Sequence, residues 1–123
     1  MSIKPSLEVV LVDIRSVHNA GSIFRTADAV GVSKIYCGGV TPAPIDRFGR
    51  KRTDFTKVSL GAEESVAWEQ VSDVPSLIAR FKSEGRKIIC VEQDTKAVDY
   101  KTVHISTENA VLVVGNEVEG LDT

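Results

Sequence analysis

Three short segments hold the polar and glycine residues from which this chain could build a binding or catalytic site. They are residues 18–21, 92–94 and 115–120, and each follows an apolar run. In open parallel sheets, ligands bind beyond the carboxyl ends of the strands, where such segments lie. Amide and carboxylate side chains can hydrogen-bond a ligand there, and glycines let it approach the main chain closely. The sequence therefore predicts a polar site built from these segments, provided that their strands are neighbours.

Arg25 is the most informative of the candidate residues. It lies in a predicted helix over residues 20–30. The apolar face of that helix is expected to consist of Ile23, Phe24, Ala27 and Val30. Because helical side chains lean toward the N-terminus, a long arginine can reach back to the site and, with the helix N-terminus, bind a phosphate or another anion. The alternative is a surface arginine paired with Asp13 or Asp28.

Asn19 and Gly31 flank the same predicted helix. An asparagine at the N-cap accepts hydrogen bonds from the free N–H groups of the first turn, which accounts for Asn19 without any function. Glycine is the residue that most often follows a helix end. We predict both caps, and Asn19 stays open to a second role in chemistry.

A dense basic stretch occupies residues 47–57, inside a region, 41–60, whose prolines and glycine predict a long loop. Its five cations face a single acid, Asp54. The cations are Arg47, Arg50, Lys51, Arg52 and Lys57. Such a cluster is typical of phosphate contact with nucleic acid, and the interleaved Phe48 and Phe55 could stack on bases. The alternative is a solvated surface loop that keeps the protein soluble.

The glycine-rich segment 115–120 follows the most apolar run of the chain. Gly115 and Gly120 allow unusual backbone angles, and Glu117 could accept hydrogen bonds from a ligand or orient Asn19 or Arg25. The spacing matches neither the dinucleotide-binding pattern nor the phosphate-binding loop of nucleotide hydrolases. A simple turn is the competing interpretation.

Four apolar runs predict the strands that must position these segments. They cover residues 8–14, 34–37, 87–91 and 110–114. Runs without alternation are typical of strands buried on both faces of a sheet. A second helix fits residues 74–84, with Asp73 as its N-cap. The order of these elements predicts one α/β domain over residues 1–123, with a mainly parallel sheet and helices on both faces.

Composition narrows the class of protein. The 123 residues suit one domain, and the 42% of hydrophobic residues exclude intrinsic disorder. No apolar run approaches the ~20 residues of a membrane helix, and the N-terminus has no signal-peptide pattern. Cys37 and Cys90 lie in apolar runs and are predicted to be reduced core residues of a cytoplasmic protein. His18 and His104 belong to no metal-ligand cluster, so no metal is expected.

The formal net charge of −2 argues against a strongly basic nucleic-acid-binding protein. The charge is unevenly distributed, however. Residues 1–60 carry nine Lys and Arg against five Asp and Glu, whereas residues 61–123 carry six against twelve. The cationic first half predicts a local anion-binding surface.

Two of these segments resemble the motifs of a known enzyme family. Residues 19–28, with Asn19 and Arg25, are similar to the first motif of the SpoU (TrmH) family of RNA 2′-O-ribose methyltransferases, within the SPOUT superfamily. Residues 113–121 look like the family's second motif, V-x-G-x-E-x-x-G. Two motifs in this order make the resemblance specific, and it covers essentially the whole chain.

The resemblance implies an RNA ribose 2′-O-methyltransferase of SPOUT-type (α/β knot) fold, with S-adenosylmethionine as cofactor and tRNA, sooner than rRNA, as substrate. It also implies a homodimer with a deep C-terminal trefoil knot and active sites near the subunit interface. By similarity, Arg25 would be the catalytic residue acting on the ribose 2′-hydroxyl, and Asn19 would hold the local geometry. The cofactor pocket would be shaped by Gly115, Asn116, Glu117 and Gly120, and more weakly by Glu92.

The sequence departs from the family at its carboxyl end. A third motif, of Ser-Leu-Asn-Val-Ser character, normally follows the second and completes both the knot and the cofactor pocket. Here the sequence stops at residue 123. We therefore expect residues 1–123 to be a methyltransferase domain without its C-terminal knot segment. We expect this incomplete domain to bind S-adenosylmethionine weakly. One alternative is a catalytically silent RNA-binding module of the same fold. Another is a small-molecule-binding α/β domain, which leaves Arg25 and the basic stretch unexplained.

Overall fold

The computed structural model describes residues 7–46, 48–93 and 109–116. Along the chain the elements are β1 (Leu7–Val12), α1 (Val17–Val30), β2 (Lys34–Gly38), α2 (Thr53–Ser59), α3 (Ala62–Ser65), β3 (Ala67–Val71), α4 (Val74–Ser83), β4 (Lys87–Gln93) and β5 (Ala110–Asn116). The predicted strands and helices occur in the predicted order, and α2, α3 and β3 lie between β2 and α4 in addition. Residues 96–108, where the sequence predicts irregular structure, lie outside the described residues.

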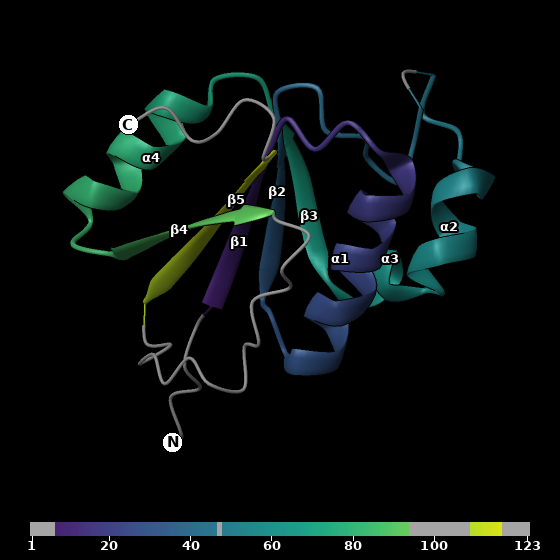
Figure 1. The fold of residues 1–123 in the computed structure, drawn as a ribbon, viewed down its shortest axis with the longest axis horizontal. Coiled ribbons are helices and arrows are strands. Elements are labelled where there is room, and N and C mark those ends of the chain that lie inside the picture. The colour runs from purple at the N-terminus through teal and green to yellow at the C-terminus, as the bar shows by residue number, and fades with distance from the viewer. Residues whose placement is uncertain (1–6, 47, 94–108, 117–123) are drawn as a thin grey trace.

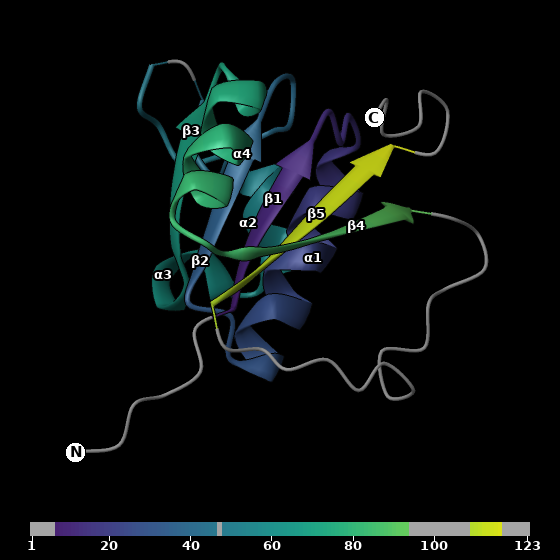
Figure 2. The same ribbon diagram turned by 90° about the vertical axis from the view of Figure 1, so that its left-hand side faces the viewer.

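The five strands form one sheet in the order β3-β2-β1-β5-β4, and every neighbouring pair is parallel. Helices α1, α2 and α3 lie on one face of the sheet and α4 lies on the other, as Figures 1 and 2 show together. The predicted α/β architecture with helices on both faces is therefore confirmed, and the described sheet is wholly parallel.

Strand β1 is central, and its side chains build a core on each face of the sheet. Val9 and Leu11 pack with α1 and α2, whereas Val10 packs with α4. All three are at most 4% exposed. This double burial is the physical reason for the unbroken apolar run, because a strand covered on both faces has no solvent side on which polar residues are favoured.

Helix α1 begins at Val17 rather than at residue 20. Its N-cap is Ser16, whose Oγ accepts a hydrogen bond from the Asn19 backbone N–H at 3.1 Å. The prediction that Asn19 caps the helix is therefore wrong, because β1 ends early enough for the chain to enter the helix sooner. Gly31 does end the helix, in the left-handed conformation with φ of 85°. Val30, predicted on the apolar face, is 52% exposed.

Replacement of Ser16 by alanine should lower the free energy of unfolding by about 1 kcal/mol, because it removes the acceptor of a first-turn N–H group. The same replacement at Asn19 should change it by less than about 0.5 kcal/mol, since Asn19 is exposed and its side chain caps nothing in the described structure. Urea unfolding of both variants measures the difference. A larger loss for Asn19→Ala than for Ser16→Ala would contradict this assignment of the cap.

The sequence pattern did not predict the short helix α2 or the edge strand β3. The region 41–60 was expected to be a loop, but it contains α2, which buries Phe55 and Ser59 within only seven residues. Strand β3 lies at the sheet edge, and most of its residues are exposed. Trp68 in β3 is partly buried and packs against the core. Short or half-exposed elements bury too few side chains to show a period in the sequence.

The second predicted helix is α4, and its predicted cap is confirmed. Asp73 accepts hydrogen bonds from the backbone N–H of Ser76 at 3.1 Å and from its hydroxyl at 2.7 Å. Both bonds hold the pKa of Asp73 below its usual value, and the bond from the Ser76 hydroxyl has the larger effect.

Both cysteines in the described part of the chain are free, and burial raises the pKa of Cys37 to about 12. Cys90 is exposed on β4, so its assignment to the core was wrong.

Candidate functional site

The three polar segments do follow neighbouring strands. Strand β5 lies between β1 and β4, and Gly115 is in register with Val12 of β1 and with Glu92 of β4. All carboxyl ends therefore meet at one edge of the sheet. From β1 the chain proceeds through β2 to β3 on one side, whereas β5 and β4 lie on the other. This border between β1 and β5 is a topological switch point, the usual ligand site of open parallel sheets.

The loops that leave β1 and β2 are fastened to each other at this edge. Asp13 has a left-handed backbone with φ of 52°, and its Oδ1 accepts a hydrogen bond from the Val40 N–H at 3.0 Å. The buried Thr41 hydroxyl accepts from the Ile14 N–H at 3.0 Å and donates to the Gly38 carbonyl at 2.8 Å. A non-glycine residue with positive φ is uncommon, and such strain persists only where surrounding contacts hold it.

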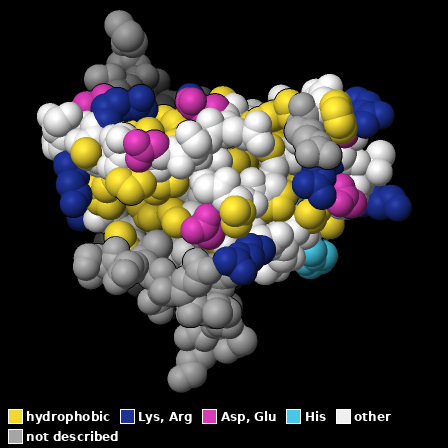
Figure 3. Space-filling model, turned by 90° about the horizontal axis from the view of Figure 1, so that it is seen from above, with side chains coloured by type: hydrophobic (Ala, Val, Ile, Leu, Met, Phe, Trp, Pro, Cys, Tyr) yellow, Lys and Arg dark blue, Asp and Glu magenta, His cyan; other side chains and the backbone are white. Residues whose placement is uncertain are grey.

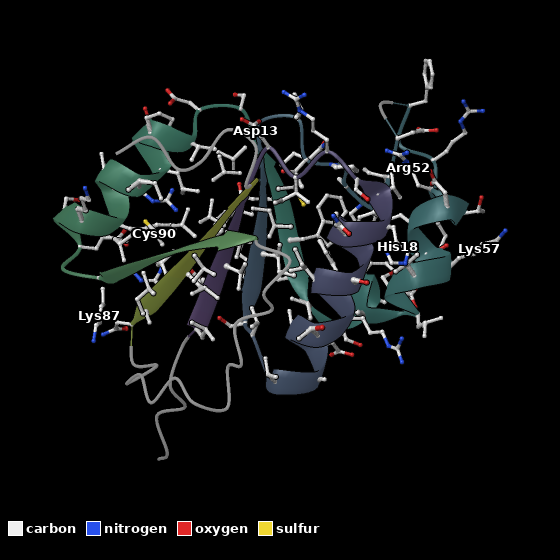
Figure 4. The ribbon with its side chains drawn as sticks, viewed as in Figure 1. Asp13, His18, Arg52, Lys57, Lys87 and Cys90 are labelled. Carbon is white, nitrogen blue, oxygen red and sulfur yellow. The ribbon has the colours of Figure 1, made fainter. Side chains whose placement is uncertain are left out.

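Sequence reasoning missed Asp13 and Thr41 as residues that shape this edge. Asp13 was considered only as an ion-pair partner of Arg25. Its signal in the sequence was a lone carboxylate near the end of an apolar run, and that of Thr41 was its place two residues after the glycine pair. Gly38 and Gly39 leave no room for side chains here, because a Cβ at Gly39 would lie 2.0 Å from Asp13 Oδ1. Figure 4 shows Asp13 at the carboxyl end of the sheet.

The predicted cofactor residues divide into described and undescribed ones. Gly115 is buried near the end of β5, and Asn116 ends that strand. Glu92 lies in β4 directly opposite Gly115. Glu117 and Gly120 lie outside the described residues. The backbone of Gly115, Asn116 and Glu92 is thus assembled at the switch point, which suits a ligand bound chiefly by main-chain groups.

Arg25 and Asn19 are both exposed on α1, but they lie on different flanks of it. Gly21 marks the flank that contacts α2, since a Cβ there would lie 3.0 Å from Val58 Cβ. Arg25, one turn further on, lies about 40° from Gly21 around the helix axis, whereas Asn19 lies about 120° from Arg25. In the described structure Arg25 forms no ion pair with Asp13 or Asp28. The catalytic roles of Arg25 and Asn19 stay predictions.

The basic stretch is an ordered turn followed by α2 rather than a loose loop. Ile45 and Lys51 form an antiparallel bridge, and Asp46 Oδ1 accepts hydrogen bonds from the N–H groups of Phe48 and Arg50 at 2.8 and 2.9 Å. Arg47 lies outside the described residues. Asp46 also approaches Arg50 Nε at 3.4 Å, so Asp54 is not the only acid that faces these cations.

The remaining cations differ in how far they are neutralised. The Arg52 guanidinium donates two hydrogen bonds to Asp54, of 3.2 and 2.9 Å, and this contact holds the pKa of Asp54 below its usual value. Lys51 and Lys57 are exposed and form no ion pair within the described part of the chain. Phe55 is fully buried and meets Phe24 edge to face at 5.0 Å, so its expected stacking on bases was wrong.

Figure 3 looks down on the carboxyl ends of the strands. Lys and Arg side chains lie at the end of the molecule that holds α4 and also at the end that holds α1, α2 and the turn before α2. Figure 4 places His18, Arg52 and Lys57 on that same side, away from α4. Over the described ranges, no group of His, Cys, Asp and Glu could hold a metal ion. Nor does any described helix have the length and apolarity to cross a membrane.

Comparison with known proteins agrees with this architecture. Residues 6–123 match the model of the SpoU rRNA Methylase family. The chain is 29% identical over 121 residues to a tRNA (guanosine(18)-2′-O)-methyltransferase of Escherichia coli, covering 96% of this chain and 48% of that protein. It is 30% identical over 119 residues to the 23S rRNA (guanosine-2′-O-)-methyltransferase RlmB of Neisseria meningitidis, with 96% and 44% covered. The chain thus spans about half the length of the curated relatives it matches.

Solved structures give the same result. An rRNA methyltransferase from Sinorhizobium meliloti superposes with a TM-score of 0.73 at 27% identity, over 97% of this chain and 43% of that one. The TrmH/SpoU tRNA modifying enzyme of A. aeolicus superposes with a TM-score of 0.70 at 27% identity, over 97% and 56%. With the family model matched over nearly its whole length and the fold shared with solved members, this chain belongs to the SpoU methylase family.

Proposed function

We propose that this protein transfers a methyl group from S-adenosylmethionine to a ribose 2′-hydroxyl of RNA, with tRNA favoured over rRNA. The observation that carries the proposal is the family match over residues 6–123, which includes the segments of Arg25 and Gly115. The tRNA preference rests on relatives such as the tRNA methyltransferase of Escherichia coli. We also propose that the protein acts in the cytoplasm as a homodimer, with a trefoil knot at the carboxyl end of its methyltransferase domain.

The carboxyl-end edge at β1 and β5 fits the cofactor. S-adenosylmethionine, when bound, would supply the electrophilic methyl group, and a solved S-adenosylmethionine-bound relative from Sinorhizobium meliloti shares the fold at 27% identity. Gly115 and Asn116 would hold it through main-chain groups, with Glu92 opposite on β4. Glu117 and Gly120 would complete the pocket. The buried, side-chain-free Gly115 supports this assignment because it lets a ligand approach the strand end closely.

Arg25 would bind a substrate phosphate and stabilise negative charge as it develops on the ribose oxygen. A guanidinium is a poor general base because it remains protonated in proteins, so the hydroxyl proton would leave by another route. Its planar fork is suited to two parallel hydrogen bonds to a phosphate. Exposure of Arg25, and its freedom from ion pairs with the nearby carboxylates Asp13 and Asp28, support a role toward a ligand rather than toward the fold.

The basic turn and α2 would hold the RNA backbone through Arg47, Arg50, Lys51, Arg52 and Lys57. Lys51 and Lys57 would contribute most, since their charges are exposed, whereas Asp54 partly neutralises Arg52. Each phosphate contact releases counterions, so RNA binding would weaken with rising salt.

The direct test is methyl transfer by the intact protein. The protein is incubated with S-adenosylmethionine labelled in its methyl group and with tRNA or rRNA, and the digested RNA is analysed for 2′-O-methylnucleosides. We expect label on a ribose, and none in a transcript whose target nucleotide is 2′-deoxy. Label on a base, or RNA binding without any cofactor binding in a titration, would overturn the proposal; the second result would identify a silent RNA-binding module.

A further inference from the structure

Phe48 lies in a turn that is held by hydrogen bonds to Asp46. The Asp46 carboxylate accepts hydrogen bonds from the backbone N–H groups of Phe48 and Arg50, and the Asp46 backbone N–H donates to the Arg50 carbonyl at 2.8 Å. Gly49 takes a φ of 77°, and its N–H donates to the Asp46 carbonyl at 2.9 Å. These hydrogen bonds hold the backbone of Phe48, Gly49 and Arg50 in the turn.

The exposure of this ring is unusual for this molecule. Phe48 is 67% exposed, whereas Phe24, Phe55 and Phe81 are at most 1% exposed. Among the aromatic residues that the structure describes, Phe48 alone is more than half exposed. Leaving a phenylalanine in water forgoes about 1.5–3 kcal/mol of burial free energy, so a ring that is two-thirds exposed suggests a contact outside the chain.

The surroundings of the ring indicate what it would contact. The Arg50 guanidinium lies 5.1 Å from the ring centroid, and the next residue along the chain, Lys51, is exposed. The turn follows β2 at its carboxyl end, on the same edge as Gly115, and projects outward before α2 (Figure 1). A flat apolar ring flanked by cations matches the chemistry of single-stranded nucleic acid, whose bases stack on aromatic rings while its phosphates contact Lys and Arg.

We propose that Phe48 is a stacking platform for an unpaired base of the RNA substrate, with Arg50 and Lys51 contacting the adjoining phosphates. This inference rests on the proposed function for the identity of the ligand as RNA. It goes further in assigning base contact to one side chain and in requiring the contacted RNA to be unpaired, because a base within a duplex does not offer its face.

Fluorescence titration of the intact protein separates this role from a general apolar contact. The probe is a 12-nucleotide single-stranded RNA that contains one 2-aminopurine, and the comparison is the same strand in a duplex. Phe48→Ala should weaken binding of the single strand roughly 5- to 150-fold, and should abolish the quenching of 2-aminopurine by stacking. Duplex binding should stay unchanged.

Four further variants sharpen the result. Phe48→Leu keeps an apolar side chain and should bind as weakly as Phe48→Ala, whereas Phe48→Trp should restore binding and quenching. Val40→Ala changes another exposed apolar residue, 61% exposed, and should have no effect. Phe48→Ala should leave the salt dependence unchanged, whereas Lys51→Ala should reduce its log–log slope by about 0.7.

Wild-type affinity for the single strand in Phe48→Ala, full binding by Phe48→Leu, or an equal loss on duplex would overturn the inference. Full binding by Phe48→Leu would indicate a general apolar contact rather than stacking. An equal loss on the duplex would indicate that the substitution disrupts the turn. Methyl transfer measured in parallel keeps the two proposals distinct. Transfer by the wild type with no effect of Phe48→Ala on binding overturns only the inference. Phe48-dependent binding without transfer to ribose overturns only the proposed function.

Discussion

Replacement of Arg25 by lysine should reduce the rate of methyl transfer about 100-fold or more, while binding of S-adenosylmethionine remains at the wild-type level. Lysine keeps the positive charge but loses the planar fork that can donate two parallel hydrogen bonds to a phosphate or a developing oxyanion. Removal of one such donor commonly costs about 100- to 1,000-fold in rate. The measurements are single-turnover methyl transfer and a cofactor titration on the same preparation.

The structure makes this variant a clean test. Arg25 is exposed and lies on the flank of α1 away from Asn19, so its replacement should change the free energy of unfolding by less than about 0.5 kcal/mol. Arg80→Lys is a matched control, because Arg80 is an exposed helical arginine of α4 that lies 4.0 Å from Glu84. It should retain full activity. Normal turnover by Arg25→Lys would remove Arg25 from the reaction.

Replacement of Phe24 by alanine should lower the free energy of unfolding by about 3–5 kcal/mol. The ring is 0% exposed and packs between the sheet and α2, where it meets Phe55 edge to face at 5.0 Å. Its removal takes apolar surface out of the core and leaves a cavity lined by β1, β2 and α2. Because small domains are stable by only about 5–15 kcal/mol, this one change could leave the domain close to unfolding at 37 °C. Urea unfolding at 25 °C measures the loss.

Val30→Ala is the matched control for Phe24→Ala, since Val30 lies in the same helix but is 52% exposed. It should change the free energy of unfolding by about 0.5 kcal/mol or less, and the better helix propensity of alanine favours a slight gain. A decrease of less than about 1 kcal/mol in the free energy of unfolding of Phe24→Ala would contradict this prediction. It would show that the packing of α1 against α2 is not the main stabilising contact of the core on that face of the sheet.

The elements that bury most of the core, namely strands β1, β2 and β5 and helices α1 and α4, were predicted from their apolar runs or helical period. Strand β4 was also predicted, from its apolar residues, although it lies at a sheet edge and none of its described side chains is buried. Short α2 and the edge strand β3 were not predicted, because Phe55 and Trp68 are almost alone in their burial there. The cap at Asn19 was misplaced for a related reason: Ser16 is also a good capping residue, and only the end of β1 decides between the two.

The sequence by itself determined the α/β class, the two motif segments and the concentration of cations before residue 58, since each of these is a property of neighbouring residues. Only the tertiary structure decided that β5 lies between β1 and β4, which brings Gly115 beside Val12 and Glu92. It also decided that Phe55 is buried whereas Phe48 is exposed. Strand order and burial depend on contacts between residues far apart in the chain, and local composition carries no record of which of them meet.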